Sequence, residues 1–148
     1  MDDHDLPPGG ACCDSAAACV FSKALLARAA VCERAARRSL GERELIECTS
    51  PVARTNCGTL AALLHERARF ALRLPAAGHP VFHAQALRLQ CGGLLGLQQA
   101  LAVAQADVHQ MVGTAHERYG SLTEVPWDTI VDVIKAWQSS RQRRITRP

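Results

Sequence analysis

Residues 44–59 read ELIECTSPVARTNCGT and place two cysteines, Cys48 and Cys57, on either side of a short polar turn. The turn contains a single proline, and Cys57 is followed at once by Gly58 and then by apolar residues at helical spacing. A helix N-terminus favours a thiolate, and glycine allows a bulky group to approach the backbone. This stretch therefore predicts an anion or metal site where a long helix begins.

The same combination of cysteine and glycine occurs once more, where Cys91 is followed by Gly92 and Gly93. Together with Gly96, these glycines fall within about one and a half turns of a predicted helix. Each costs up to about 1 kcal/mol relative to alanine in a helix interior. Glycines at such a density indicate close approach by another helix or by a cofactor.

The composition favours one helical domain. The chain has 148 residues, of which 48% are hydrophobic and only 4% aromatic, and alanine and leucine dominate the apolar set. The net charge of +3 is too small to argue for nucleic-acid binding. The sequence has no apolar run long enough to span a membrane, and its acidic start lacks the apolar core of a secretory signal, so we expect a cytoplasmic protein.

The predicted fold is an all-α, single-domain bundle of four or five helices. We divide the chain into a disordered N-terminal tail (1–15), a helical domain (16–140) and a basic C-terminal tail (141–148). The first helix is predicted to run unbroken over 16–40 and to end at a glycine cap, Gly41. The remaining helical segments are predicted over 42–47 (a short turn that doubles back), 57–74, 81–105, 106–119 and from Pro126 onward.

Cysteine is the residue type that carries the functional prediction. Seven cysteines in a reducing compartment are not expected to form structural disulfides, which leaves metal binding, reactive thiols or burial as small apolar residues. Cys12 and Cys13 lie in the tail and are not expected to bind metal, because ordering the tail would cost entropy. No pair has the CxxC spacing of zinc ribbons or bacterial ferredoxins. The alternative interpretation is that the five cysteines outside the tail fill alanine-sized places in a helical core.

Helix geometry limits which cysteines can share one site. On an unbroken helix, Cys19 and Cys32 lie about 20 Å apart and point in different directions, so only one of them can join a given cluster. If 42–47 folds back along that helix, Cys48 returns to the level of Cys32. The predicted metal ligands are therefore Cys32, Cys48, Cys57 and Cys91, with Cys19 as the substitute for Cys32 on an extended return path.

Four thiolates on separate helices suit a 4Fe-4S cubane or a zinc ion with four cysteine ligands. We prefer the iron–sulfur cluster, because tight zinc knuckles are missing and the glycines leave room for a larger group. Arg54 is positioned to offset the negative charge of a cluster, although a solvated turn residue is the simpler interpretation. The predicted function is a small cytoplasmic iron–sulfur protein acting in electron transfer, cluster delivery or redox sensing, with a redox enzyme or accessory complex as partner.

Two other functions stay open. One is a metal-free or zinc-stabilised helical module for protein interaction, or an accessory subunit; the other, weaker, is a DNA-binding regulator that uses the arginine-rich tail. The sequence contains no GxSxG, HExxH or Walker motif, so no catalytic residues are predicted. The histidines are interpreted as surface residues, although His109 and His116 are seven apart and share a helix face. The stripe from Trp127 to Trp137 is predicted to pack on the bundle.

Overall fold

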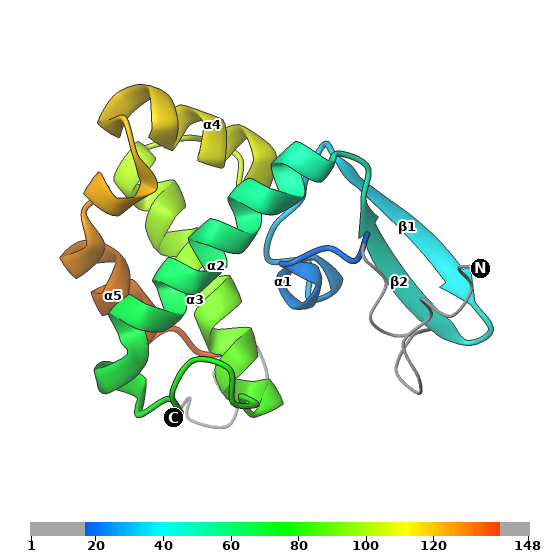
Figure 1. Cartoon of the computed structure of the whole chain (residues 1–148), viewed down its shortest axis with the longest axis horizontal. Coiled ribbons are helices and arrows are strands. Elements are labelled where there is room, and N and C mark those ends of the chain that lie inside the picture. Colours follow the sequence, from blue (N-terminus) through cyan, green and yellow to red (C-terminus); the bar gives the residue numbers. More distant parts are fainter. Residues whose placement is uncertain (1–16, 140–148) are drawn as a thin grey trace, which may run out of the picture.

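The computed structural model describes residues 17–139, and Figure 1 shows a helical body with a two-stranded hairpin projecting from one side. The predictions for tails 1–15 and 141–148, and those for Cys12 and Cys13, fall outside the described residues. In chain order the elements are α1 (Ser22–Leu26), β1 (Ala35–Leu40), β2 (Arg43–Cys48), α2 (Pro51–Leu72), α3 (His83–Leu101), α4 (Val108–Tyr119), the short 3₁₀ helix η3 (Leu122–Glu124) and α5 (Trp127–Ala136).

The prediction of an all-α fold is correct only in part. The protein is mostly helical, with five α-helices among the described residues, but β1 and β2 form an antiparallel sheet. The register pairs Leu40 with Arg43 and Ala35 with Cys48. Salt bridges between strands, such as Arg37 to Glu44 at 3.1 Å, lie on the exposed hairpin surface, where each contributes little to stability.

The predicted unbroken helix over 16–40 is wrong. Within the described part of that range, residues 17–40, the chain forms the five-residue helix α1, strand β1 and irregular segments. Gly41 has φ = +66° and lies with Glu42 in a two-residue hairpin turn, rather than capping a helix. The segment 42–47 doubles back as predicted, but residues 43–47 of it belong to strand β2 and not to a helical turn. Helix propensity is a weak prior, and here the pairing of strands overrides it.

Helix α2 begins six residues earlier than predicted. Ser50 is its N-cap and accepts a hydrogen bond from the backbone N–H of Ala53 at 3.1 Å, while Pro51 occupies the first helical position. Cys57 consequently lies in the second turn of α2, not at its N-terminus. The helix dipole argument made for Cys57 from the sequence therefore does not apply.

Helix α3 is the centre of the helical body, and its glycines are explained by helix packing. A Cβ atom on Gly92 would lie 2.9 Å from Ile134 Cα, and one on Gly96 would lie 3.0 Å from Ile130 Cα. Both contacts bring α5 against α3, while Gly93 faces the side chain of Leu64 on α2. Of the two explanations offered for the glycines, close approach by another helix is the one that the structure shows.

The C-terminal apolar stripe packs as predicted. Trp127, Ile130 and Ile134 of α5 are buried in the core, and Trp137 is partly buried against it. The indole N–H of Trp127 donates to the carbonyl of Leu122 at 3.1 Å, so its polar atom is also satisfied. Over residues 17–139, no helix combines the length and apolar character needed to span a bilayer.

We predict that Gly92→Ala lowers the free energy of unfolding by about 1–3 kcal/mol, because the added methyl meets the backbone of α5. Gly113→Ala is the matched control, since a Cβ there has no neighbour within 4 Å. That control should gain up to about 1 kcal/mol from improved helix propensity. Urea denaturation of both variants makes the measurement, and equal stability of the two would contradict the packing role of Gly92.

Candidate metal centre

Four cysteines that are far apart in the sequence line one narrow space, which we call the central cavity. Its lining residues come from the hairpin, from the segments on either side of α1, and from helices α2 and α4. Its lining consists of Cys19, Val20, Cys32, Ala35, Cys48, Ala53, Arg54, Cys57 and Val108. Apart from the arginine and the four thiols, every lining residue is apolar. The structure therefore brings together Cys32, Cys48 and Cys57 of the predicted ligand set, and it adds Cys19 rather than Cys91.

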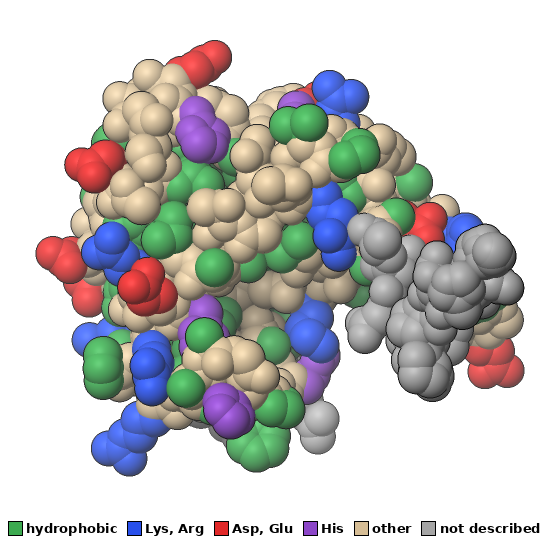
Figure 2. All heavy atoms as spheres, viewed as in Figure 1, with side chains coloured by type: hydrophobic (Ala, Val, Ile, Leu, Met, Phe, Trp, Pro, Cys, Tyr) green, Lys and Arg blue, Asp and Glu red, His purple; other side chains and the backbone are tan. Residues whose placement is uncertain are grey.

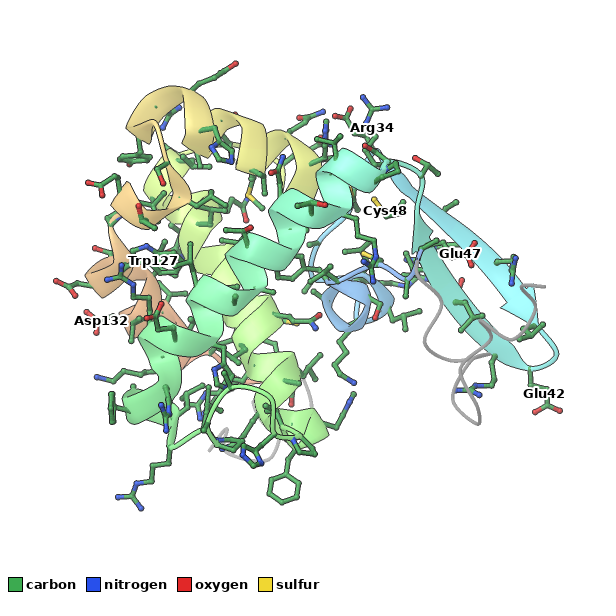
Figure 3. All side chains as sticks on the ribbon, in the orientation of Figure 1. Arg34, Glu42, Glu47, Cys48, Trp127 and Asp132 are labelled. Atoms are coloured by element: carbon green, nitrogen blue, oxygen red, sulfur yellow. The ribbon has the colours of Figure 1, made fainter. Side chains whose placement is uncertain are left out.

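Backbone pairing positions Cys19 and Cys48. The N–H of Cys19 donates to the carbonyl of Ile46 at 2.9 Å, and the N–H of Cys48 donates to the carbonyl of Ala17 at 2.7 Å. Residues 17–19 thus run antiparallel along the edge of β2 that β1 does not use. Figure 3 shows Cys48 at the end of the hairpin nearest the start of α2. Its thiol donates to the carbonyl of Ser50 at 3.2 Å.

Cys32 is held against the N-terminus of α4. The adjacent Val31 forms a parallel bridge there, donating to the carbonyl of Ala106 at 2.9 Å and accepting from the N–H of Val108 at 2.8 Å. The sulfur of Cys32 accepts hydrogen bonds from the backbone N–H groups of Arg34 and His109. Because His109 is the second residue of α4, the positive end of a helix dipole faces this sulfur.

Helix α2 contributes one face to the central cavity. Ala53, Arg54 and Cys57 are spaced three and four residues apart, so they lie side by side on the helix. The Nε–H of Arg54 donates to the carbonyl of Ala18 at 2.7 Å, which ties the segment carrying Cys19 to α2. Arg54 is thus a lining residue with a fixed backbone contact, and not the solvated turn residue that the simpler interpretation suggested.

Burial is the main electrostatic influence on these thiols. It raises the pKa of Cys57 from an ordinary value of 9.0 to about 12, with the neighbouring cysteines adding to the effect. Burial also raises the pKa of Cys19 and that of Cys32, against the opposing effect of backbone N–H donors at both sulfurs. In the absence of a metal, Cys19, Cys32 and Cys57 are therefore neutral thiols at physiological pH. A metal that binds here must displace their protons.

The central cavity is narrow. The empty space inside the cavity and at its mouth is about 320 Å³. Only about 10 Å³ of that space is wide enough for a water molecule. No three histidine, cysteine or acidic side chains in the described part of the chain are arranged to hold a single metal ion. The donor set therefore consists of four thiols facing a narrow and mostly apolar gap.

Cys91 lies outside the central cavity. It is 2% exposed in the core of the helical body, and burial among apolar side chains raises its pKa to about 11. No cysteine is among the groups that affect its pKa. Its position before Gly92 and Gly93, which suggested a ligand, reflects the packing of α3 against α5 and α2.

Two other groups lie near the cysteines: His109, which the sequence analysis interpreted as a surface residue, and Asp107, which it did not single out. His109 Nδ1 lies 2.6 Å from a carboxylate oxygen of Glu33, the residue after Cys32. Asp107, which is buried, caps α4 by accepting from the N–H of Gln110 at 3.1 Å. In the sequence, Asp107 stands directly before an amphipathic segment, which is typical of a helix N-cap and could have predicted its role.

Comparisons of the chain with known protein families, with curated proteins and with solved structures find no match. The functional argument therefore depends on the residues and their geometry alone.

The raised pKa of Cys57 predicts how the stability of the metal-free protein depends on pH. Between pH 9.0 and about 12 the unfolded chain loses this thiol proton while the folded chain retains it. The stabilisation is fully present below pH 9.0 and is lost as the pH rises above it. Urea denaturation at about pH 8 and about pH 10 should show a larger loss for the natural sequence than for Cys57→Ala. Identical losses would contradict the burial of Cys57.

Proposed function

We propose that this protein binds a 4Fe-4S cluster through Cys19, Cys32, Cys48 and Cys57. The observation that carries the proposal is the convergence of these four thiols on one apolar cavity. They come from four different segments: a sheet-edge segment, a loop, a strand end and a helix. Free cysteine is often buried singly as a small apolar residue. Core packing alone gives no reason for four of the five described cysteines to meet.

We prefer a cluster to a single zinc ion because the sequence lacks the tight CxxC pairs that small zinc sites usually use. In a cubane each of the four thiolates binds a different iron. Zinc with four cysteine ligands is the alternative cofactor for the same donor set.

The surroundings of the sulfurs suit an anionic cluster. Backbone N–H groups donate to the sulfurs of Cys19 and Cys32, and such bonds tune the potential of iron–sulfur centres. The guanidinium of Arg54 lies in the cavity lining and offsets negative charge. When bound, the cluster supplies one-electron chemistry. The chain supplies the thiolates, the hydrogen bonds and a cavity that is largely closed to water.

The biological role that fits this site is electron transfer, cluster delivery or redox sensing in the reducing cytoplasm, together with a protein partner such as a redox enzyme or accessory complex. On the face drawn in Figure 2, basic and acidic side chains are interspersed and do not form a field of one sign. This distribution does not favour nucleic acid as a partner. We assign no catalytic residue.

A second function is a metal-free helical module for protein interaction or an accessory subunit. It is favoured by the narrowness of the central cavity and by the raised pKa values, because neutral thiols pack acceptably without any metal. The two functions predict purified protein of different colour and metal content. Colourless, fully folded and metal-free protein favours the module, whereas colourless protein with stoichiometric zinc favours the zinc site.

Anaerobically purified protein is predicted to be brown, with broad absorbance at about 400 nm from charge transfer between thiolate and iron. Serine substitution at Cys19, Cys32, Cys48 or Cys57 should each lower the iron and sulfide retained after desalting. Cys91→Ala is the matched control and should retain both, although it costs stability in the core. Loss of iron from the Cys91 variant alone would contradict the proposed ligand set.

Arg54→Met is predicted to retain less iron than the natural sequence, because it removes a positive charge and frees the carbonyl of Ala18. Arg54→Lys keeps the charge and should retain an intermediate amount. Iron content measured after equal times of desalting makes the comparison, with urea denaturation as the check on folding. Equal retention by all three proteins would show that Arg54 has no part in holding the cluster.

A further inference from the structure

A second pocket lies between the C-terminal half of α2 and the connection of residues 73–82 that leads to α3, and we call it the loop pocket. The space in it that is wide enough for water molecules is about 570 Å³, against about 10 Å³ in the central cavity. Pockets that bind small organic molecules commonly span about 300–1,000 Å³. The loop pocket and the central cavity have no lining residue in common, so the two sites are independent.

Small residues keep the loop pocket open. Ala62 lines it on α2, and Ala77 and Gly78 line it on the connection, where Val81 adds a larger apolar side chain. Gly78 has φ = +91°, a left-handed backbone conformation that glycine adopts without a steric cost. The connection therefore passes beside α2 with little side-chain volume at these positions to fill the gap.

The connection is fixed in place, so the loop pocket is formed before any ligand arrives. Figure 1 shows it bridging the adjacent ends of α2 and α3. Its residue Leu74 is buried in the core, and the N–H of His79 donates to the carbonyl of Ala76 at 3.1 Å. The side-chain Nε2 of Gln85 on α3 donates to the carbonyl of Leu72 at 3.1 Å. A ligand that binds a preformed pocket does not bear the entropic cost of ordering it.

Three side chains with N–H donors line the loop pocket from two sides. His65 and Arg69 are four residues apart on α2 and so lie on one face of the helix, while His79 belongs to the connection. Within residues 17–139, neither the two imidazoles nor the guanidinium forms a hydrogen bond or an ion pair with another side chain. The guanidinium carbon of Arg69 lies 5.8 Å from the ring centroid of Phe70. The pocket therefore offers several donors to a ligand that accepts hydrogen bonds.

One acidic side chain, Glu66, also lines the loop pocket, beside His65 on α2. It lies three residues before Arg69, but no ion pair joins the two in the described part of the chain. A carboxylate in the lining attracts no anion, and it repels a second negative charge on a ligand more than it repels a single one. The charges of the lining therefore match a ligand with one negative charge.

We propose that the loop pocket binds a small monocarboxylate with an apolar body, of the size of a medium-chain alkyl or an aryl-alkyl carboxylic acid. The planar guanidinium of Arg69 donates two parallel N–H bonds to the carboxylate, a geometry that this pair adopts readily. The imidazoles of His65 and His79 donate to the same group. The apolar body lies against Ala62 and Val81, where it is removed from water.

The experiment is a titration of the full-length protein with octanoate and with 4-phenylbutanoate, followed through the chemical shifts of the backbone amides. Octanamide has the same chain as octanoate without the charge, and octyl phosphate carries a second negative charge. We expect both carboxylates to bind, with the largest shifts at residues of the loop pocket. Octanamide and octyl phosphate should each bind about tenfold more weakly than octanoate. The tighter of the two carboxylates defines the shape of the apolar body.

Two matched pairs of variants locate the site. Arg69→Gln should weaken octanoate binding about tenfold, whereas Arg73→Gln changes an exposed arginine outside the pocket lining and should not. Ala62→Leu fills part of the pocket and should weaken both carboxylates by a similar factor. Ala71→Leu makes the same change at an exposed position of α2 outside the lining, and binding should be unchanged. Glu66→Gln should reduce the preference for octanoate over octyl phosphate.

Absence of octanoate binding, or equal binding of octanoate and octanamide, would overturn the inference, because the charge would then have no part in recognition. Equal affinity of Arg69→Gln and Arg73→Gln for octanoate would also overturn it, since the carboxylate would then lie elsewhere. Tighter binding of octyl phosphate would overturn the assignment of a single negative charge. Urea denaturation shows whether each variant is folded. Because the iron content is measured separately, failure of this inference is distinguishable from failure of the proposed function.

Discussion

Strand β2 is paired along both of its edges, and the position of the cysteines depends on that pairing. One edge is hydrogen-bonded to β1. The other is hydrogen-bonded to residues 17–19 through the bonds at Cys19 and Cys48. The second pairing is only three residues long, but it brings the beginning of the described chain to the point where the hairpin meets α2. The bond from Arg54 to the carbonyl of Ala18 then ties this short segment to the helical body.

The helices of the body were predictable because their side chains face one core. The apolar stripe of α5 lies in the core as predicted, and the glycines of α3 correctly indicated close packing. The hairpin was not predictable in the same way, because residues 35–48 are rich in alanine, arginine, leucine and glutamate, which favour helices. The one local signal was Gly41, whose positive φ suits a tight hairpin turn equally well as a helix cap.

The error in the first helix had a direct effect on the expected site. A rod of 25 residues would have kept Cys19 and Cys32 about 20 Å apart and forced a choice between them. A short helix followed by a strand allows both to line the central cavity. Cys91 illustrates the opposite problem. The pattern of cysteine followed by glycine is the same at Cys57 and Cys91, and only the three-dimensional packing distinguishes a cavity wall from a helix crossing.

The bridge between Val31 and Asp107 has a consequence for the order in which the protein is assembled. During synthesis from the N-terminus, the four cysteines of the central cavity emerge before the segment that supplies Val108 and the N–H of His109. The hairpin and the start of α2 can form from contacts close in sequence, whereas this last wall closes a loop of more than 70 residues. A nascent chain therefore presents its four thiols to solvent before the start of α4 closes over them.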